Sequence, residues 1–314
     1  MATNIRAGVI GVGYLGKFHA KIYANMEGVD LVGVADSNPQ TAEKIAAEYG
    51  CQAYTDSKDL LDKVDAVSIV VPTVYHLEIA RPFLEAGVHM LMEKPIAPSY
   101  EESLQLVELA EKAKVVFQVG HLERFNAGVM ALAGRVKNPR FIEAHRLSPF
   151  VARATDVDVV TDLMIHDIDI ILSLVKSDID QINAAGTSVI TNHIDIANVR
   201  LGFKNGAVAN VTASRVSTKR YRRIRIFEQK HYYSLNYDDQ QLDIASASPP
   251  KDENGWPEIN QETLHLEPCL PLDAELAAFI QSVRTNTPPL VTGRVGLEAV
   301  RVANIIKENM SACL

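Results

Sequence analysis

Three side chains in this sequence, Lys94, Asp162 and His166, are of the types that enzymes use to move protons. Lys94 precedes Pro95, which disfavours helical backbone at the lysine and so gives its side chain a reproducible direction. Asp162 and His166 are four residues apart, a spacing that places both on one face of a helix. A lysine in a partly desolvated cleft can titrate near neutral pH, and a histidine oriented by a carboxylate can act as a general base. We therefore expect these three residues to be catalytic.

Structural roles would also account for these residue types. A lysine in a loop is usually a solvated charge, and an aspartate in the first turn of a helix interacts favourably with the helix dipole. Thr161 is expected to cap that helix at its N-terminus. Histidine and carboxylates also bind zinc, but no third ligand stands out at a metal-binding spacing, so we predict no metal.

A glycine-rich loop follows the apolar segment 5–10 and precedes a helical pattern. In its spacing, G-x-G-x-x-G, Gly11 permits a tight turn, Gly13 lets a pyrophosphate approach the backbone, and Gly16 lets helix and strand pack closely. Asp36 ends the next apolar segment, 20 residues after Gly16, where a carboxylate binds a ribose 2′-hydroxyl and repels a 2′-phosphate. The pattern predicts NAD as the cofactor. The loop residues expected to contact it are Gly11, Gly13, Tyr14, Leu15 and Gly16.

The first 120 residues alternate between strand-like and helix-like segments. The expected strands are 6–10, 30–35, 52–54, 66–71, 89–92 and 115–119. The expected helices are 15–26, 39–49, 57–61, 75–86 and 100–112. Such alternation produces a doubly wound parallel sheet, a Rossmann fold, whose ligands bind beyond the carboxyl ends of the strands. Asp36, Pro72-Thr73 and Glu93-Lys94-Pro95 all lie at such ends, so we expect one crevice to collect them.

After about residue 121 the pattern changes to short strand-like runs separated by polar turns. Segments 194–203 and 207–217 flank Asn205-Gly206, a strong hairpin signal. The remaining expected elements are strands at 222–228, 232–237 and 241–244, a loop at 246–257, and helices at 162–174, 273–284 and 294–309. We predict an α/β chain with a Rossmann domain over 1–122. An α+β domain with an open, mainly antiparallel sheet is expected over 123–314.

Two groups of polar residues after the last parallel strand could contact a phosphorylated substrate. Arg124 and Asn126 follow that strand directly, although a salt bridge and a helix cap would explain them equally well. Segment 219–225 contains five basic residues, and strand alternation places Arg222 on the same face as Ile224. A solvated strand or a subunit contact is the default interpretation, with a diphosphate contact as the alternative.

The composition is that of an ordinary globular protein, with 47% hydrophobic and 22% charged residues. The net charge of −8 argues against nucleic acid as a partner. No signal-peptide pattern opens the sequence and no apolar run approaches about 20 residues, so we expect a cytoplasmic protein without membrane contact. The three scattered cysteines, Cys51, Cys269 and Cys313, are expected to be reduced thiols.

Together these motifs resemble the Gfo/Idh/MocA oxidoreductases over nearly all 314 residues. The motifs that carry the resemblance are Gly11-x-Gly13-x-x-Gly16, Val71-Pro72-Thr73-x-x-His76, Glu93-Lys94-Pro95 and Asp162-x-x-x-His166. The resemblance implies that Lys94 and His166 are the acid/base groups and that Asp162 is a carboxylate of the substrate site. It also places Thr73, His76, Glu93 and Lys94 beside the cofactor and suggests a cis bond between Lys94 and Pro95.

Residues 120–126, Gly-His-Leu-Glu-Arg-Phe-Asn, depart from the commoner family pattern Gly-Phe-Asn-Arg-Arg-Phe. With 223–237 they resemble the branch that acts on UDP-linked sugars, above all UDP-N-acetylglucosamine. This implies hydride transfer from a sugar secondary hydroxyl to NAD, at C3 of a UDP-N-acetylhexosamine, with Arg124 and Asn126 among the substrate contacts. The alternatives are an inositol or free-sugar dehydrogenase and a non-catalytic NAD-binding regulatory protein. A homodimer or homotetramer is expected, with an aminotransferase as a downstream partner.

Overall fold

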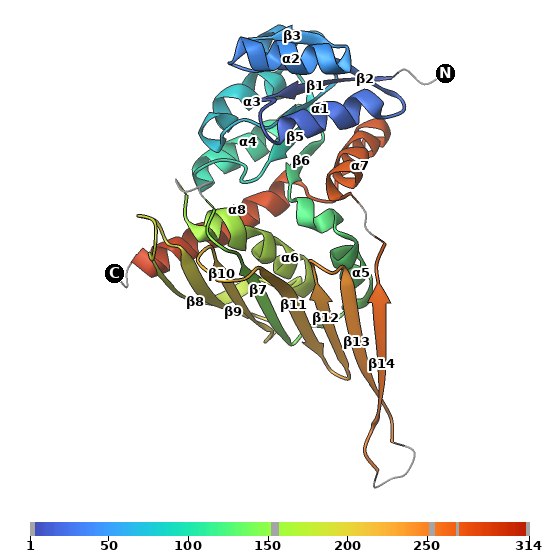
Figure 1. Ribbon diagram of the computed structural model, residues 1–314, viewed down its shortest axis with the longest axis vertical. Coiled ribbons are helices and arrows are strands. Elements are labelled where there is room, and N and C mark those ends of the chain that lie inside the picture. The colour runs from blue at the N-terminus through green and yellow to red at the C-terminus, as the bar shows by residue number, and fades with distance from the viewer. Residues whose placement is uncertain (1–3, 152–156, 251–254, 268–269, 312–314) are drawn as a thin grey trace. The chain divides into compact units, whose positions relative to one another are not determined.

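The computed structural model describes residues 4–151, 157–250, 255–267 and 270–311 of the chain. These residues form two units (Figure 1). The first unit combines Met1–Leu122 with Leu270–Val300, and the second combines Glu123–Cys269 with Arg301–Leu314.

Six parallel strands form the sheet of the first unit, in the order β3-β2-β1-β4-β5-β6. They are β1 (Ile5–Ile10), β2 (Val29–Ala35), β3 (Gln52–Tyr54), β4 (Ala66–Ile69), β5 (His89–Glu93) and β6 (Phe117–Gly120). The connecting helices are α1 (Gly16–Asn25), α2 (Pro39–Tyr49), α3 (His76–Glu85) and α4 (Tyr100–Ala113), with 3₁₀ turns at Ser57–Leu60 and Thr73–Tyr75. The strand order reverses between β1 and β4, which makes their carboxyl ends the topological switch point. The predicted doubly wound fold is confirmed.

Local sequence explains where the helices of this unit begin and end. The Asn38 side chain accepts hydrogen bonds from the N–H groups of the first turn of α2, and Pro39 occupies the first helical position. Gly50 ends the same helix with a φ of 70°, in the left-handed region that favours glycine. Ser99 caps α4 by accepting a hydrogen bond of 3.1 Å from the N–H of Glu102.

Residues 270–300 pack with the first unit, whereas the sequence-based division assigned everything after residue 122 to a second domain. Helix α7 (Pro271–Thr285) places Leu276, Phe279 and Ile280 in the core that also contains Val9 of β1. The boundary at residues 122 and 123 coincides with the expected one. Periodicity identifies an amphipathic helix but not the surface that it covers, so only tertiary contacts could assign α7.

Eight strands form the sheet of the second unit, in the order β14-β13-β12-β11-β7-β10-β9-β8. They are β7 (Phe141–Leu147), β8 (Ile179–Thr187), β9 (Ile196–Phe203), β10 (Val208–Ser214), β11 (Tyr221–Glu228), β12 (His231–Asn236), β13 (Gln241–Ser248) and β14 (Glu258–His265). The β7–β10 pair is parallel and the other neighbouring pairs are antiparallel. A mainly antiparallel sheet is therefore confirmed. It is not the simple meander expected, because β7 lies between β10 and β11.

Strands β7, β8 and β14 were not expected from the sequence. β14 reads Glu-Ile-Asn-Gln-Glu-Thr-Leu-His and is exposed along nearly its whole length. Because it pairs only with β13 at the edge of the sheet, it needs no alternation of apolar residues. The loop expected at 246–257 begins later, since β13 continues to Ser248, and residues 251–254 of it lie outside the described part of the chain.

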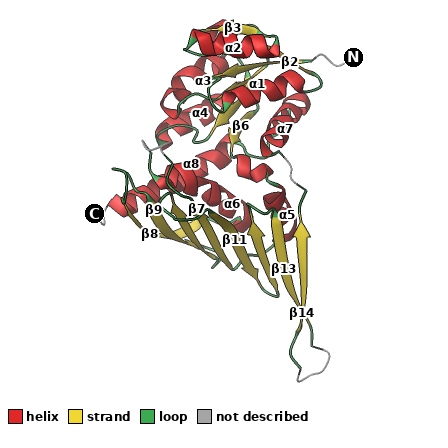
Figure 2. Cartoon of the chain, viewed as in Figure 1, coloured by secondary structure: helices red, strands yellow, loops and turns green. Residues whose placement is uncertain are grey.

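Helices cover one face of this second sheet (Figure 2). They are α5 (Ala127–Arg135), a π-helical turn (Val160–Met164), α6 (Ile165–Val175) and the C-terminal part of α8 (Gly293–Ser311). Their apolar side chains and the inward-facing residues of the strands form one core, in which Ile168 of α6 and Ile224 of β11 are fully buried. The helix that carries His166 is therefore fixed on a rigid sheet.

Candidate active site

The glycine-rich loop has the conformation that a phosphate-binding turn requires. Gly11 has a φ of +83°, and a Cβ added there would lie 2.7 Å from the carbonyl oxygen of Val70. A Cβ on Gly16 would lie 1.8 Å from the carbonyl oxygen of Gly11, so the start of α1 packs too closely for any side chain. A Cβ on Gly13 would meet nothing within 4 Å. Open space at Gly13 beside an α-helix N-terminus suits the close approach of a pyrophosphate.

Asp36 lies directly after β2 and organises the backbone around this loop. One carboxylate oxygen accepts a hydrogen bond of 2.9 Å from the N–H of Val12, and the other accepts one of 2.9 Å from the N–H of Asn38. A cavity of about 650 Å³ extends from the glycine loop past Asp36 to Pro72 and Tyr75, beyond the ends of β1, β2 and β4. The glycines, the carboxylate and the cavity fit an adenine dinucleotide with a free 2′-hydroxyl.

Thr73 opens the 3₁₀ turn after β4, and His76 opens the helix that follows it. His76 is buried, with Nδ1 3.0 Å from the carbonyl oxygen of Ile96 and Nε2 3.0 Å from that of Val71. Burial lowers the pKa of His76, which favours the neutral ring. The neutral ring has one N–H and so donates to one of these two carbonyl oxygens, which places His76 between the end of β4 and the segment after Lys94.

Glu93 is the last residue of β5, and the bond between Lys94 and Pro95 is cis. The Glu93 side chain is 14% exposed, and its Oε1 lies 3.4 Å from Nε2 of the buried His19. A Cβ on Gly120 would lie 3.0 Å from Glu93 Oε2, so the facing position of β6 leaves room for the carboxylate only as glycine. Glu93 therefore points into the protein, while Lys94 begins the loop at the carboxyl edge of the sheet.

Arg124 and Asn126 both make structural contacts in the second unit. The Asn126 side chain caps α5 by accepting a hydrogen bond of 2.9 Å from the N–H of Gly128. Arg124 Nη1 lies 3.3 Å from Oδ1 of Asp169, which is buried on α6. The sequence allowed two interpretations of these residues, substrate contacts or a helix cap and a salt bridge. The structure contains both the cap and the salt bridge.

Asp162 and His166 occupy the junction between the π-helical turn and α6, and both are half-buried. Thr161 does not cap this helix, so that prediction was wrong. Asp158 has this role, because its Oδ1 accepts hydrogen bonds from the Thr161 N–H at 2.9 Å and from its hydroxyl at 3.2 Å. Aspartate and threonine are both good caps, and the sequence contains the two types three residues apart.

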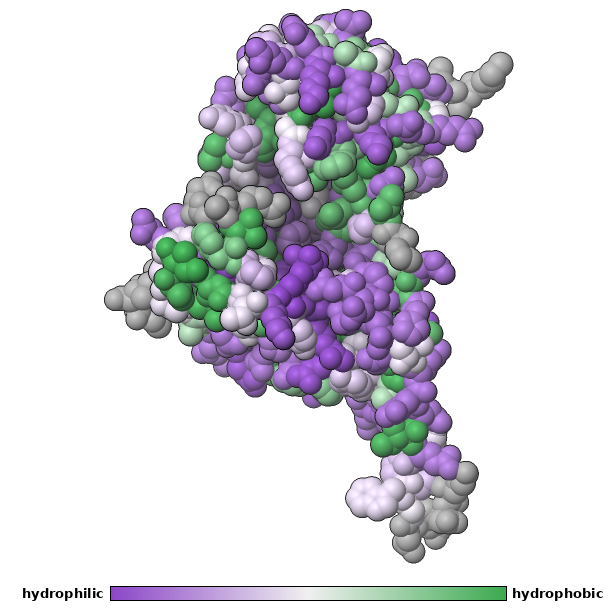
Figure 3. Space-filling view, in the orientation of Figure 1, coloured by the Kyte–Doolittle hydropathy of each residue, from purple (hydrophilic) through white to green (hydrophobic). Residues whose placement is uncertain are grey.

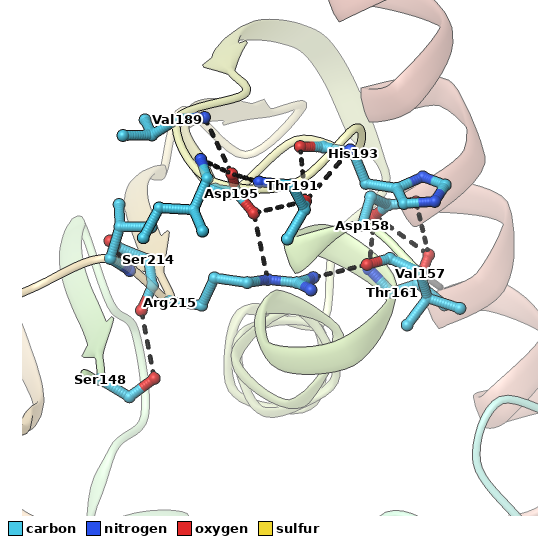
Figure 4. A network of polar contacts seen from close by, with 12 residues as sticks. Ser148, Val157, Asp158, Thr161, Val189, Thr191, His193, Asp195, Ser214 and Arg215 are labelled. Atoms are coloured by element: carbon cyan, nitrogen blue, oxygen red, sulfur yellow. Dashed lines mark hydrogen bonds and ion pairs between the residues drawn. The ribbon is translucent and has the colours of Figure 1, made fainter. Parts of the chain in front are cut away.

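A buried aspartate holds the backbone beside this helix start (Figure 4). Asp195 accepts hydrogen bonds of 2.7–2.8 Å from the three consecutive N–H groups of residues 189–191. Burial by itself would raise the pKa of Asp195, but these donors and the Thr191 hydroxyl outweigh it and hold that pKa far below its usual value. Arg215, 3.8 Å from Asp195, donates a 2.6 Å hydrogen bond to the carbonyl oxygen of Val157. This network fixes the chain just before Asp158.

An ion pair next to His166 was not predicted from the sequence. Arg146 of β7 makes two hydrogen bonds to Asp167 of α6, at 2.8 and 3.0 Å, and both side chains are about 2% exposed. The same guanidinium contacts Glu123 at 2.8 Å and lies 5.3 Å from the centre of the Tyr237 ring. Asp167 directly follows His166, so this contact attaches the catalytic candidate to the sheet. The feature of the sequence that could have predicted this ion pair is an arginine at an inward-facing position of a strand.

The basic segment forms β11, as expected, and its side chains alternate between the two faces. Ile224 and Ile226 are fully buried, and Arg222 shares their face. On the other face Arg223 donates to Ser234 at 2.7 Å and Arg225 pairs with Glu143. The surface over the middle of this unit is strongly hydrophilic (Figure 3).

The predicted site residues fall into two sets. The glycine loop, Asp36, Thr73, His76, Glu93 and Lys94 belong to the first unit, and Arg124, Asn126, Asp162 and His166 belong to the second. Within the described ranges, no group of three or more histidine, cysteine, aspartate or glutamate side chains is arranged to hold a metal ion. None of the helices in the described part of the chain is long and apolar enough to cross a membrane. Cys51 carries a free thiol, and Cys269 and Cys313 lie outside the described residues.

Comparison with known families agrees with this geometry. Residues 5–121 match the oxidoreductase family with an NAD-binding Rossmann fold, and residues 129–233 match the GFO/IDH/MocA C-terminal domain. The chain belongs to the GFO/IDH/MocA oxidoreductase family. The resemblance inferred from the motifs is confirmed, and the cofactor of this GFO/IDH/MocA protein is NAD.

Several relatives match over nearly their whole length. A UDP-N-acetylglucosamine 3-dehydrogenase of Acidithiobacillus ferrooxidans is 37% identical over 99% of both chains. Its solved structure superposes with a TM-score of 0.91 at 36% identity, covering 99% of each chain. An inositol 2-dehydrogenase of Rhizobium meliloti is 30% identical over 96% of this chain and 95% of its own. This GFO/IDH/MocA protein is therefore an NAD-dependent oxidoreductase of the sugar dehydrogenase type.

Proposed function

We propose that the protein oxidises the C3 hydroxyl of a UDP-N-acetylhexosamine, with NAD as the hydride acceptor. The observation that carries the proposal is the 37% identity, over 99% of both chains, to a UDP-N-acetylglucosamine 3-dehydrogenase. The glycine loop, Asp36 and the adjoining cavity support the cofactor part of the assignment.

The reaction removes a proton from the hydroxyl oxygen and a hydride from its carbon, so that a C=O bond forms. NAD, when bound, supplies the hydride acceptor. Lys94 and His166 are the two groups proposed to accept the hydroxyl proton and to return it in the reverse reaction. Asp162 is proposed to bind the substrate and to hold the reacting hydroxyl in place. Anchoring of α6 through the Arg146–Asp167 pair keeps His166 in a fixed position.

An incompletely paired arginine of the second unit, Arg222, supports a substrate with phosphate groups. Arg222 is partly enclosed, at 26% side-chain exposure, and its closest carboxylate, Glu123, is 3.9 Å away and already bound to Arg146. Burial lowers the pKa of Arg222, and the nearby Arg146 and Arg220 lower it further. Among the described residues, Nε of Arg222 has no hydrogen-bond partner. A diphosphate oxygen would supply both the missing acceptor and the missing charge.

The second candidate is an inositol or free-sugar dehydrogenase. It is supported by the inositol 2-dehydrogenase that is 30% identical over 96% of this chain. A polyol has no phosphate, so this function would leave Arg222 without the partner that its surroundings favour.

A direct assay separates the two candidates. Purified protein is mixed with NAD and either UDP-N-acetylglucosamine, N-acetylglucosamine or myo-inositol, with a carbonyl trap in each reaction, and reduced nicotinamide is followed by absorbance. Activity confined to the UDP-sugar supports the proposal, and activity confined to a polyol supports the second candidate. If no reduced nicotinamide forms with any of the three substrates although NAD still binds, a non-catalytic regulatory protein is favoured.

The matched variants are Arg222→Met and Arg225→Met, which remove arginines from opposite faces of β11. Arg222→Met should lower kcat/KM for the UDP-sugar about tenfold or more, because a charge-assisted hydrogen bond is lost. Arg225→Met should leave kcat/KM nearly unchanged. Equal effects of the two substitutions would contradict the diphosphate contact.

We also propose a homo-oligomer, a dimer or a tetramer, whose 3-keto product is used by an aminotransferase. A ketone next to the N-acetylated carbon is a suitable amino acceptor. Light scattering of the purified protein measures the oligomeric state. A coupled assay with an aminotransferase and an amino donor should draw the oxidation forward.

A further inference from the structure

A group of buried polar side chains in the first unit has no part in the proposed chemistry. Its members, called here the Glu275 cluster, are His19 and Tyr23 of α1, Ser68 of β4, Glu93 of β5, Gln118 of β6 and Glu275 of α7. All of them are 0% exposed except Glu93, which is 14% exposed. Five fully buried polar side chains in one core demand a physical explanation, because unpaired polar groups are costly to bury.

Strand register brings the sheet members of the cluster together. Ser68 of β4 lies opposite Leu91 of β5, and Leu91 lies opposite Gln118 of β6. Glu93, two residues after Leu91, is on the same face and opposite Gly120. Leu91 belongs to the same apolar core as Leu276, Phe279 and Ile280 of α7.

The helices supply the remaining members. His19 Nε2 lies 3.4 Å from Glu93 Oε1, and the Tyr23 hydroxyl lies 2.8 Å from Oγ of Ser68. Gln118 Nε2 donates a 3.1 Å hydrogen bond to the main-chain oxygen of Glu275.

Glu275 differs from the other members of the cluster because its whole carboxyl group is buried without a hydrogen bond to any residue that the structure describes. It precedes the core residue Leu276, and its two carboxyl oxygens are buried without a hydrogen-bond partner in the described part of the chain. Burial raises the pKa of Glu275 well above its ordinary value, and the negative charge of the nearby Glu93 raises it further. Burial also raises the pKa of Tyr23, and the nearby Glu275 contributes to that rise. Burial and the charge of Glu93 thus both favour the neutral form of Glu275.

Further atoms of the cluster share the lack of partners. Within the described ranges, Oε1 of Gln118 and Nδ1 of His19 form no hydrogen bond, and Nε2 of His19 has the 3.4 Å contact with Glu93 but no hydrogen bond. Buried polar atoms of this kind are usually joined by internal water, which needs two to four polar partners. The cluster offers that number on α1, β6 and α7.

We propose that the Glu275 cluster encloses an internal water site in which Glu275 remains protonated, donates a hydrogen bond toward Glu93, and so positions the adjacent Lys94. The assignment rests on the proposed acid/base role of Lys94. Glu275 acts through Glu93 and is a positioning residue. A protonated carboxyl group can donate to an ionised one, which explains how two carboxyl groups share a core.

The protonation state can be tested without turnover. An infrared difference spectrum at pH 7 between the holoenzyme with NAD and its Glu275→Gln variant should contain the C=O band of a protonated carboxylic acid, present only in the wild type. Ser282→Ala, another buried polar position on α7, is the control and should retain the band. The absence of this band in the wild type would overturn the proposal, whatever substrate the enzyme uses.

The positioning role is tested by pH profiles of kcat/KM for whichever substrate the direct assay identifies. Glu275→Gln should keep a profile close to that of the wild type, because its amide N–H can donate to the same water. Glu275→Leu removes the donor and should lower kcat about tenfold. Its pH profile should differ from that of the glutamine variant, because only the leucine variant lacks a donor toward Glu93, the neighbour of Lys94. Identical profiles for the Leu and Gln variants would overturn the positioning role.

Discussion

At the scale of single residues, the polar groups expected to do chemistry are held by contacts that the sequence does not display. Asp36 uses its two carboxylate oxygens to bind backbone N–H groups on both sides of the glycine loop. His76 lies between two carbonyl oxygens, 3.0 Å from each, and donates to one of them, which gives it a structural role beside the cofactor region. Arg124 and Asn126 are an ion-pair partner and a helix cap. Lys94, Asp162 and His166 remain the residues proposed to act on the substrate.

Replacing Lys94 by alanine tests its assignment as an acid/base group. We expect kcat to fall about 100- to 10,000-fold, the usual contribution of a positioned proton-transfer group. NAD affinity, measured by the change in protein fluorescence on titration, should change little. Lys112→Ala, at an exposed position of α4, is the matched control and should retain kcat. Near-normal turnover in Lys94→Ala would remove Lys94 from the mechanism.

Replacing Asp36 by alanine tests the cofactor preference. The affinity for NAD should fall about tenfold or more, because a charged hydrogen-bond partner of the ribose is lost. Discrimination against NADP should weaken as well, since the carboxylate no longer repels a 2′-phosphate. The control is Asp30→Ala at the other end of β2, where the side chain is bound by Asn4. An unchanged ratio of NAD to NADP affinities would contradict this reading of Asp36.

At the scale of elements, α6 is the part of the second unit whose position matters most for chemistry. Its buried Asp167 pairs with Arg146, and its buried Asp169 pairs with Arg124. Ile168, between the two aspartates, packs in the apolar core. The π-helical turn before it is fixed by Asp158, and the backbone before that turn by Arg215. His166 therefore extends from a helix that is held at both ends of its first turn.

The Arg146→Met variant tests how strongly α6 is held. Removing one partner of a buried ion pair leaves Asp167 charged and unpaired, so the free energy of unfolding should fall by about 3–5 kcal/mol. Arg294→Met breaks the exposed pair with Glu111 and should hardly move the midpoint of unfolding. Chemical denaturation of the two variants measures both effects. Similar midpoints would mean that the Arg146 pair adds little to stability.

The loss of folding stability at acidic pH should depend on Asp195. Its pKa in the folded state is far below that of an unfolded aspartate, so its stabilising effect is complete above about pH 4 and is lost as the pH falls toward the folded-state pKa. Asp195→Ala should therefore be less stable than the wild type at pH 7. The difference should narrow below about pH 4. Thermal melting of both proteins between pH 3 and 7 checks this prediction. A difference in melting temperature that stays constant over this range would show that the ionised form of Asp195 is not the source of the stabilisation.

At the scale of the whole molecule, the first unit is built from two separated stretches of chain. Residues 270–300 complete it, because α7 inserts Leu276, Phe279 and Ile280 into its core. The unit that binds NAD is thus not the contiguous segment that the alternating pattern defines. Residues from the two stretches also build the Glu275 cluster.

A fragment of residues 1–122 should consequently fail to fold on its own. Without α7 it would expose the apolar surface around Val9 and Tyr23 and lose three large buried side chains. Joining residues 270–300 to it through a flexible linker should restore cooperative unfolding and NAD binding. Circular dichroism and NAD titration compare the two polypeptides. Stable folding of the shorter one would show that α7 is dispensable.

The sequence by itself determined the parallel sheet, its glycine loop and the carboxylate after β2. These features follow from local rules, since strand runs, glycine spacing and the residue ending a strand are all read within about 30 neighbouring residues. Lys94 and His166 were predicted to be catalytic from motifs that are short and contiguous, and that assignment remains a prediction. The hairpin at Asn205-Gly206 was predicted for the same reason.

Only the tertiary structure decided which distant segments meet. The Arg146–Asp167 pair joins positions 21 residues apart in chain order, and Gln118 and Glu275 are 157 apart. Strand β14 lies at the edge of its sheet and is largely exposed, so its sequence shows no alternation of apolar residues. The surface that α7 covers depends on tertiary packing and not on the periodicity of its apolar residues. Burial and long-range pairing depend on the whole fold, which is why the polar groups that support the proposed catalytic residues became visible only there.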